Sequence, residues 1–303
     1  MQDIIKEIIA RKLGKVLINE KISNYTTYKV GGKVRAIVYP KTREELSELI
    51  KFLKEKKVKY FVLGNGSNVL FSDNLYDGII IKLDYFNVIK YIDNTTINVG
   101  AGVSLMKLSR DTVKNGLTGL EFADGIPATV GGAIFMNAGA YGSEMAEITK
   151  EVEIIDGDGE IITLSNKEMS FSYRTSWLQK KLDCVCIGAT LKLNEGNQEE
   201  MMTLVLERRN KRKNSQPLAF PSAGSVFRNP KDMYAGELIE KLGLKGFSIG
   251  KAEISEKHAN FIINKGNAKA SDIKKIIDYV KEKVKNKYNV RLRVEQRLIN
   301  WDE

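Results

Sequence analysis

The segment of residues 121–142 most constrains how this chain can fold. It reads EFADGIPATVGGAIFMNAGAYG, so ten of its 22 residues are glycine or alanine. Small residues leave the backbone open to close approach, and exposed N–H groups in a turn or at a helix start form a concave set of donors that suits phosphate. Gly131 and Gly132 would open such a turn. Taken alone, the pair could equally let two backbone segments pack tightly.

A second glycine loop follows the apolar run Tyr60-Phe61-Val62-Leu63 and consists of Gly64, Asn65, Gly66, Ser67 and Asn68. A short buried strand that ends in this loop again offers bare N–H groups, with side-chain donors beside them. Asn-Gly is also a strong hairpin-turn signal, which is the alternative interpretation. Neither loop fits a Rossmann fingerprint or a P-loop. Together they predict a phosphate-bearing cofactor in another kind of fold.

Length and hydropathy limit the class of protein. The 303 residues are enough for two or three domains. No apolar run approaches the roughly 18 residues that a membrane-spanning helix needs. Residues 1–17 are predicted to form an amphipathic helix rather than a signal peptide, so we expect a cytoplasmic protein without membrane insertion.

The net charge of +10 would permit nucleic-acid binding. Lys and Arg, however, alternate with Glu along residues 51–59 and 274–287, a pattern typical of solvated helix faces. We therefore expect no nucleic-acid partner. The cluster at residues 208–213 is denser, and an anionic substrate could account for part of it.

Few side chains are available for metal or nucleophilic chemistry. Cys184 and Cys186 lie two residues apart on a predicted strand, point to one face and are expected to be small core residues rather than a disulfide. His258 is the single histidine and lies far in sequence from both loops. We therefore expect no metal site and no Ser-His-Asp triad.

The order of predicted elements indicates an α+β protein. Residues 34–39, 43–56 and 59–63 have the pattern of a βαβ unit, with a capping box formed by Thr42 and Glu45. The other predicted strands are 78–83, 87–92, 96–99, 152–156, 160–164, 184–193, 261–264 and 290–299. The other predicted helices are 104–115, 198–213, 235–242 and 272–288, the last capped by Ser271.

Five separated motifs occur in one order along the chain. They are the two glycine loops, SYRTS at residues 172–176, AGSVFRNP at 223–230 and VEQRLI at 294–299. This order resembles the UDP-N-acetylenolpyruvoylglucosamine reductases, flavoenzymes that make UDP-N-acetylmuramic acid for bacterial cell walls. The resemblance runs from about residue 24 to residue 299. It implies an α+β fold: an FAD-binding domain of the vanillyl-alcohol-oxidase (PCMH) type, with subdomains at 1–76 and 77–213, and a C-terminal substrate-binding domain at 214–303.

The resemblance implies bound FAD. Neither loop contains a His or Cys that could tether a flavin, so the FAD is expected to be non-covalent. The implied FAD-binding residues are Gly64, Asn65, Gly66, Ser67, Asn68, Gly125, Ile126, Thr129, Gly131, Gly132, Asn137, Ala138 and Gly139.

Three catalytic residues follow from the resemblance. By themselves, Arg174 would be a surface or interdomain ion pair, Ser225 a turn residue, and Glu295 part of a charge ladder with Arg293 and Arg297 on a final strand. In the family, the matching serine donates a proton, and the matching arginine and glutamate stabilise an enolic intermediate. No base lies near Ser225 in the sequence, which argues against a hydrolase nucleophile.

Lys213, Arg228 and Asn229 are implied to bind the substrate diphosphate. Arg228 stands where the family more often has lysine, which changes the binding geometry but keeps the charge. Ala128 stands where the family has glycine, so its backbone must accept a Cβ. The short interval from Arg174 to Ser225 leaves no room for the tyrosine loop of one subclass, so the chain resembles the subclass without it.

The implied partners are UDP-N-acetylglucosamine enolpyruvate and NADPH, and a monomer is expected. One alternative is a flavin oxidase on the same fold; another is a basic nucleotide-binding or nucleic-acid-binding protein without catalysis. The absence of a tethering residue favours the reductase over the oxidase, and a yellow purified protein would exclude the binding protein. The sequence leaves open the choice between NADPH and NADH and whether the substrate domain moves.

Overall fold

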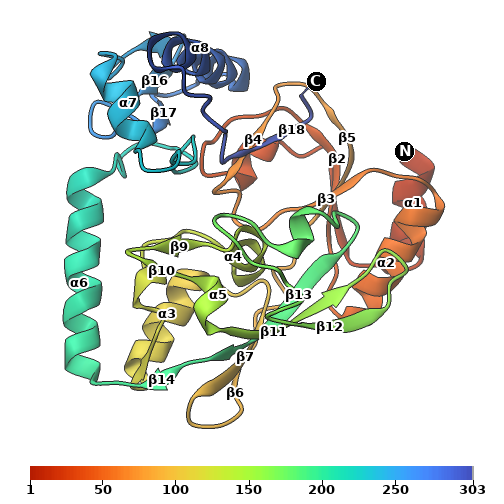
Figure 1. Cartoon of the computed structure of the whole chain (residues 1–303). Coiled ribbons are helices and arrows are strands. Elements are labelled where there is room, and N and C mark those ends of the chain that lie inside the picture. Colours follow the sequence, from red (N-terminus) through yellow and green to blue (C-terminus); the bar gives the residue numbers. More distant parts are fainter. Residues whose placement is uncertain (302–303) are drawn as a thin grey trace. The chain divides into compact units, whose positions relative to one another are not determined.

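The computed structural model describes residues 1–301, and the chain divides into two compact units (Figure 1). Unit 1 comprises Met1–Ile18, Arg35–Asn65 and Asp77–Asn210. Unit 2 comprises Asn19–Val34, Gly66–Tyr76 and Lys211–Glu303. Each unit is therefore assembled from segments that are distant in the sequence, and the first glycine loop is one of the places where the chain passes from one unit to the other.

The first sheet of unit 1 has the strand order β1-β2-β5-β3. Its strands are β1 (Lys15–Ile18), β2 (Val34–Tyr39), β5 (Tyr76–Ile81) and β3 (Tyr60–Val62). Helix α2 (Arg43–Glu55) connects β2 to β3, and Thr42 caps it by accepting from the Glu45 N–H at 3.2 Å. The predicted strand-helix-strand order is confirmed, but β5 lies between β2 and β3 and pairs with β3 in parallel. The hairpin alternative for the first loop is wrong, because β3 and β4 (Val69–Phe71) do not pair with each other.

The N-terminal helix is shorter than the sequence predicts. Helix α1 (Gln2–Ala10) ends seven residues before the expected boundary, and β1 follows. Lys12 and Gly14 have positive φ (+57° and +132°), which stops the helix. At Gly14 a Cβ would lie 2.6 Å from the Tyr39 carbonyl oxygen, so the chain can turn closely against the end of β2 only with glycine there.

A five-stranded antiparallel sheet, β12-β11-β13-β7-β6, forms the rest of the framework of unit 1. Its strands are β12 (Ile161–Ser165), β11 (Thr149–Ile155), β13 (Val185–Lys192), β7 (Thr96–Gly100) and β6 (Ile89–Tyr91). A hairpin joins β11 to β12. Helix α4 (Val130–Met136) packs on β13 and β7, which seats the second glycine loop on the core.

Several short elements complete unit 1. They are α3 (Leu105–Lys114), α5 (Met145–Ile148), β8 (Leu117–Thr118), β9 (Gly139–Ala140), β10 (Ser143–Glu144), β14 (Asn194–Glu195), η2 (Glu121–Ala123) and η3 (Trp177–Gln179). Cys186 is buried in the core of this unit and Cys184 packs against it, and both are free thiols, as predicted. Burial raises the pKa of Cys184 to about 11 and that of Cys186 to about 12.

Unit 2 is built around a small antiparallel sheet covered by a helix. The sheet has the order β15 (Ser248–Ile249), β16 (Ala252–Ile254) and β17 (Ile262–Asn264), and α8 (Ala270–Tyr288) packs on β15 and β16. The apolar residues of α8 that recur at helical spacing are buried: Ile273, Ile276, Ile277, Val280 and Val284. Helix α7 (Ala235–Lys241) packs against α8, and η1 (Ile22–Tyr25) also belongs to this unit.

Two predicted boundaries in unit 2 are wrong. Helix α8 starts at Ala270 after Lys269, so Ser271 lies within the helix instead of capping it. The final strand is limited to β18 (Arg297–Ile299), which pairs in parallel with β4, and Val294 makes a single bridge to Phe227. Glu295 consequently lies between two pairings rather than on a continuous ladder.

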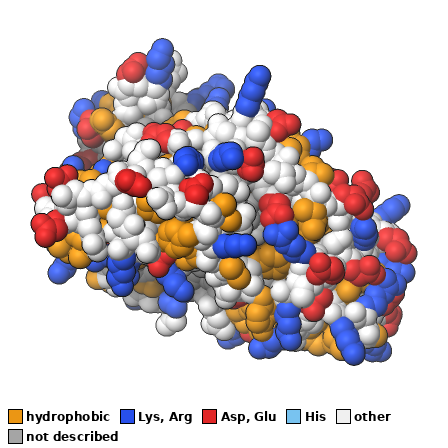
Figure 2. All heavy atoms as spheres, turned by 90° about the horizontal axis from the view of Figure 1, so that it is seen from below, with side chains coloured by type: hydrophobic (Ala, Val, Ile, Leu, Met, Phe, Trp, Pro, Cys, Tyr) orange, Lys and Arg blue, Asp and Glu red, His pale blue; other side chains and the backbone are white. Residues whose placement is uncertain are grey.

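Helix α6 (Gln198–Ser215) contains the point in the sequence where unit 1 ends, at Asn210, and unit 2 resumes, at Lys211. Over residues 1–301, no helix combines the length and the apolar character that crossing a bilayer requires. On the face drawn in Figure 2, Lys and Arg side chains are interspersed with Asp and Glu rather than gathered in one basic patch.

Candidate functional site

Within unit 1, Gly64 and Asn65 of the first glycine loop lie beside the second glycine loop. The Asn65 side chain donates from Nδ2 to the Pro127 carbonyl oxygen at 3.2 Å. Gly64 faces Thr129 so closely that a Cβ on Gly64 would lie 2.6 Å from the Thr129 hydroxyl oxygen. The two loops are about sixty positions apart in the sequence but are neighbours in the structure. One ligand could therefore contact both of them.

The glycines of these loops differ in their surroundings. A Cβ on Gly131 would lie 2.9 Å from the Ala101 Cβ, and one on Gly139 would lie 2.5 Å from the Ser143 carbonyl oxygen, so both are needed for packing. A Cβ on Gly132 would meet one atom within 4 Å in the described chain outside its own helix and neighbours, the Thr129 hydroxyl oxygen at 3.4 Å. The protein leaves room beside the backbone of Gly132. A phosphate group could therefore approach the backbone closely at this position.

Local sequence explains how the second loop is built. The Thr129 hydroxyl caps α4 by accepting from the Gly132 N–H at 3.3 Å. Asn137 ends the helix in the left-handed conformation, with φ +42°. Ala128 lies outside the positive-φ region, and its N–H donates to the Ile126 carbonyl at 2.8 Å. The prediction that this backbone position accepts a Cβ is confirmed.

The side chain of Asn137 is fully buried and acts inside the protein. Its Nδ2 donates to the Ser172 carbonyl oxygen at 3.0 Å, and its Oδ1 accepts from the Ala146 N–H at 2.9 Å. Asn137 thus ties the end of the second glycine loop to the segment that carries Arg174. Gly125, Ile126 and Ala138 are half-buried along the same loop.

Arg174 is brought to the second glycine loop by a tight turn. Ser172 and Thr175 exchange two backbone hydrogen bonds, of 3.0 and 2.9 Å, and Arg174 between them has φ +56°. Its Nη2 donates to the Gly139 carbonyl oxygen at 2.7 Å. A left-handed conformation at a non-glycine residue costs about 1–3 kcal/mol and persists where the surroundings hold it, often at functional sites.

Further contacts fix the Arg174 turn to α4. The Gln179 side chain donates from Nε2 to the Arg174 carbonyl at 3.0 Å and to the Phe135 carbonyl at 2.9 Å. The Ser176 hydroxyl donates to the same Phe135 carbonyl at 2.8 Å. The helix η3 follows this segment, and the predicted strand 184–193 appears as β13, which begins at Val185.

Asp124, directly before Gly125, was missed by the sequence analysis. Its carboxylate is 2% exposed and accepts from Arg110 (Nε to Oδ1, 2.7 Å) and from Arg209 (Nη2 to Oδ1, 2.9 Å). Burial favours a higher pKa, but hydrogen bonds from Arg209 and Arg110 outweigh it and hold the pKa of Asp124 below its ordinary value. Arg209 belongs to the cluster at residues 208–213, so part of that positive charge stabilises unit 1.

Lys82 is the second residue that the sequence analysis missed. Its side chain is 9% exposed, and its Nζ donates to the Gly64 carbonyl oxygen at 2.7 Å and pairs with Asp84 at 3.3 Å. A buried ammonium thereby fixes the first peptide of the first glycine loop. The available signal was a lysine directly after the three buried isoleucines 79–81, a position where a charge is costly unless it is paired.

In unit 2, Ser225 lies on a segment without regular secondary structure. The Glu295 N–H donates to the Val226 carbonyl at 2.8 Å, and the Arg228 N–H donates to the Arg293 carbonyl at 2.9 Å. The structure therefore places Glu295 beside the residue that follows Ser225. Both predicted catalytic residues of unit 2 are half-buried.

The part of the first glycine loop that belongs to unit 2 contacts the segment that carries Glu295. Asn68 donates from Nδ2 to the Glu295 carbonyl at 3.3 Å, and its own carbonyl accepts from the Arg297 N–H at 2.9 Å. Gly66 has φ +64°, and a Cβ there would lie 2.4 Å from the Tyr25 carbonyl oxygen, so this glycine is required by the backbone. Ser67 between them is half-buried.

The three predicted diphosphate-binding residues all belong to unit 2. Arg228 and Asn229 follow Ser225 on the same segment, and Asn229 Oδ1 accepts from the Ala235 N–H at 3.1 Å at the start of α7. Lys213 is exposed near the end of α6, and its carbonyl accepts from the Lys257 ammonium. The amide nitrogen of Asn229 and the Lys213 ammonium are thus presented on different elements of this unit.

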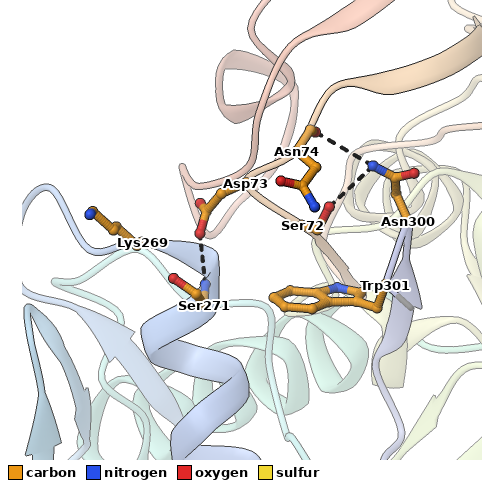
Figure 3. A pocket seen from close by; sticks show the side chains of 7 residues that line it. All are labelled: Ser72, Asp73, Asn74, Lys269, Ser271, Asn300 and Trp301. Carbon is orange, nitrogen blue, oxygen red and sulfur yellow. Dashed lines mark hydrogen bonds between the residues drawn. The ribbon is translucent and has the colours of Figure 1, made fainter. Parts of the chain in front are cut away.

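A cavity of about 570 Å³ in unit 2 is lined by none of the predicted binding or catalytic residues (Figure 3). Its polar groups pair with one another: Asp73 accepts from the N–H groups of Ala270 and Ser271, both at 2.9 Å, and Asn300 donates to the Ser72 hydroxyl at 3.1 Å. The Asp73 carboxylate therefore already satisfies the start of α8. In the described part of the chain, no group of three or more His, Cys, Asp or Glu residues could hold a metal ion.

Comparison with known domain families defines the class of protein. Residues 34–165 match an FAD binding domain, and residues 216–299 match the UDP-N-acetylenolpyruvoylglucosamine reductase C-terminal domain. The chain is thus an FAD-dependent oxidoreductase of α+β architecture, as predicted, and both glycine loops lie inside the segment that matches the FAD binding domain.

Full-length relatives define the family. The chain is 45% identical to the UDP-N-acetylenolpyruvoylglucosamine reductase of Anoxybacillus flavithermus over 99% of both chains, and 44% identical to that of Bacillus subtilis over the same shares. It belongs to the UDP-N-acetylenolpyruvoylglucosamine reductase family. The crystal structure of the Thermus caldophilus reductase is similar with a TM-score of 0.80 at 35% identity, over 94% of this chain and 98% of that one. A variant of Phl p 4 described as a glucose oxidase, 15% identical over 65% of this chain with a TM-score of 0.51, shares the fold alone.

Proposed function

We propose that this protein reduces UDP-N-acetylglucosamine enolpyruvate to UDP-N-acetylmuramate, with NADPH as the hydride source and FAD as the bound cofactor, in peptidoglycan precursor synthesis. The observation that carries the proposal is the arrangement in unit 1. Two glycine loops are packed together, the backbone of Gly132 is left open, and Arg174 is hydrogen-bonded to Gly139.

The FAD is held without a covalent bond by the glycine loops, including the half-buried Gly125, Ile126, Ala138 and Ser67. The open backbone at Gly132 suits a pyrophosphate, and Lys82 and Asp124 keep the two loops in place. Acid precipitation should leave the flavin in the supernatant. Flavin that remains attached to the precipitated protein would contradict this assignment.

Bound FAD would supply the hydride that reaches the terminal carbon of the substrate's enolpyruvyl double bond. The negative charge that results lies on the adjacent carbon and its carboxylate. Arg174 can form charge-assisted hydrogen bonds to that carboxylate, and Glu295 assists in stabilising the enolic form, as in the family. The Ser225 O–H bond breaks and its proton goes to the adjacent carbon, and solvent returns a proton to the serine. The balance is one hydride and one proton added to the double bond.

Lys213, Arg228 and Asn229 bind the diphosphate of the sugar nucleotide. The positive charge of Lys213 and Arg228, and the position of Arg228 and Asn229 just after Ser225, support this. We further propose that the protein is a cytoplasmic monomer of the subclass without the tyrosine loop, with functional domains at residues 1–76, 77–213 and 214–303. These functional boundaries are a different division from the two packing units.

Stopped-flow absorbance of the FAD-loaded protein tests the function. NADPH should bleach the flavin absorbance, and UDP-N-acetylglucosamine enolpyruvate should restore it without oxygen. NADH, tested at equal concentration, decides the preference between the two nicotinamides. If an alcohol or hydroxy acid bleaches the flavin and the enolpyruvyl substrate does not restore it, the chain is an oxidase and the proposal is wrong.

A further inference from the structure

Two buried amide side chains form hydrogen bonds to the segment that carries Ser225, one before the serine and one after it. Gln296 is 3% exposed, and its Nε2 donates to the carbonyls of Ala223 at 3.1 Å and Gly224 at 3.4 Å. Asn260 is 4% exposed; its Nδ2 donates to the Phe227 carbonyl at 2.8 Å, and its Oδ1 accepts from the Phe227 N–H at 2.9 Å. The two residues before Ser225 and the second residue after it are therefore held by side chains.

This segment needs side-chain partners because backbone pairing satisfies only part of it. Gly224 has φ +72°, and the backbone hydrogen bonds of the segment begin at Val226, whose N–H donates to the Asn260 carbonyl at 2.9 Å and whose neighbour Phe227 bridges to Val294. Buried peptide groups outside a helix or sheet must find other partners. Gln296 and Asn260 supply them at the positions where the sheet does not.

The orientation of the Gln296 amide is set by Tyr28. The fully buried Tyr28 hydroxyl donates to Gln296 Oε1 at 3.2 Å. An amide oxygen accepts and an amide nitrogen donates, so the hydroxyl on one side and the two carbonyls on the other fit one orientation of the amide only. Burial raises the pKa of Tyr28, so its hydroxyl stays protonated over the physiological range.

The position of Gln296 also links Ser225 to Glu295. Gln296 directly follows Glu295, whose N–H donates to the Val226 carbonyl at 2.8 Å. Consecutive residues thus contact both flanks of Ser225: the Gln296 side chain holds the carbonyls before it, and the Glu295 backbone holds the carbonyl after it. A shift of the Gln296 amide would move Ser225 relative to Glu295.

We infer that Gln296, oriented by the Tyr28 hydroxyl, is a positioning residue that fixes Ser225 for proton transfer to the substrate. This rests on the proposed function, in which Ser225 is the proton donor. Gln296 itself touches the backbone of residues 223 and 224, not the reacting atoms. Misplacement of a donor by about 1 Å can cost on the order of a hundredfold in rate.

The test compares the two half-reactions in Gln296→Met, which keeps the length of the side chain and removes both polar atoms. Flavin bleaching by NADPH should stay within about twofold of wild type, because it needs no proton from Ser225. Recovery with UDP-N-acetylglucosamine enolpyruvate should slow at least tenfold, while the KM for that substrate changes by less than about threefold. A loss in kcat at nearly constant KM is the signature of a group misplaced in the transition state.

Tyr28→Phe is the second variant and keeps the aromatic core packing. It should slow recovery less than Gln296→Met does, and the double variant should be no slower than Gln296→Met alone, because the hydroxyl acts only through the amide. Asn300→Gly is the matched control. It removes amide hydrogen bonds elsewhere in unit 2, at a residue whose φ of +62° suits glycine, and should leave both half-reactions unchanged.

The outcomes separate the inference from the function on which it rests. If wild-type flavin does not recover with the enolpyruvyl substrate, the proposed function fails. If wild type recovers and Gln296→Met recovers equally fast, the positioning role alone is wrong. Equal slowing of both half-reactions with a lower melting temperature, or equal slowing in Asn300→Gly, would make Gln296 merely structural and would overturn the inference.

Discussion

Substitution of Gly132 should separate the stability of the protein from its ability to bind FAD. Gly132 lies in the first turn of α4, and a Cβ there meets only the Thr129 hydroxyl oxygen, at 3.4 Å, in the described chain outside its own helix and neighbours. Gly132→Ala should stabilise the flavin-free protein by about 0.5–1 kcal/mol, because glycine is unfavourable in a helix. In a domain of 150–250 residues this corresponds to a rise in Tm of about 1–4 °C.

The same methyl group would occupy the space through which a pyrophosphate approaches the backbone. We expect the Kd for FAD to rise at least tenfold, about 1.4 kcal/mol, in Gly132→Ala and further in Gly132→Val, whose side chain is branched. FAD titration by flavin fluorescence measures affinity, and thermal unfolding of flavin-free protein measures stability. Gly236→Ala is the matched control: it lies in the first turn of α7, its Cβ would lie 3.4 Å from His258, and it should leave FAD affinity unchanged.

Gly131→Ala should behave in the opposite way to Gly132→Ala. Its Cβ would lie 2.9 Å from the Ala101 Cβ, so the flavin-free protein should lose stability. Full FAD occupancy in Gly132→Val would refute the placement of the pyrophosphate. A lower melting temperature in flavin-free Gly132→Ala would contradict the conclusion that the space beside Gly132 can hold a methyl group.

Three other predictions address the remaining residues. Ser225→Ala should let NADPH bleach the flavin at a near wild-type rate but slow recovery by roughly 10²–10⁴-fold, the loss typical of a general acid; loss of both half-reactions would indicate a damaged cofactor site. Lys213→Ala should raise the KM for the sugar nucleotide more than it lowers kcat, and an unchanged KM would place the diphosphate elsewhere. Asp124 has a folded-state pKa below its unfolded value, so its stabilisation is present above the unfolded pKa and is lost as pH falls through the folded pKa. Asp124→Asn should therefore unfold more easily in urea at pH 7, by about 1.5–3 kcal/mol, with a shallower loss of stability in acid; an unchanged free energy of unfolding at pH 7 would contradict the role of this ion pair.

Local patterns predicted most helices and strands of this chain. Strand 34–39 was predicted to the residue, and α2 was predicted with the help of its capping box, because these signals depend on neighbouring residues. The errors occur where distant segments decide the outcome. The N-terminal helix stops where the chain turns against β2, and the final strand is broken because its partners, Phe227 and β4, come from different parts of the chain.

The candidate site shows the same division. The glycine loops were predicted from residue type at a fixed local spacing, and the roles of Arg174, Ser225 and Glu295 were predicted from the resemblance of their motifs to the family. Lys82 and Asp124 were not found, because Gly64 lies 18 residues from Lys82 and Arg209 lies 85 residues from Asp124, and no local spacing links either pair.

The sequence by itself therefore determined the class of fold, the order of the elements and the residue types available for binding and catalysis. Only the tertiary structure decided which glycine leaves open space, since Gly131 and Gly132 are indistinguishable in the sequence yet one faces Ala101 and the other does not. It also decided which polar side chains form the hydrogen bonds and ion pairs that fix the loops. The physical reason is that close packing and hydrogen bonding join residues by distance in space, and residues distant in the sequence come close together only in the folded chain.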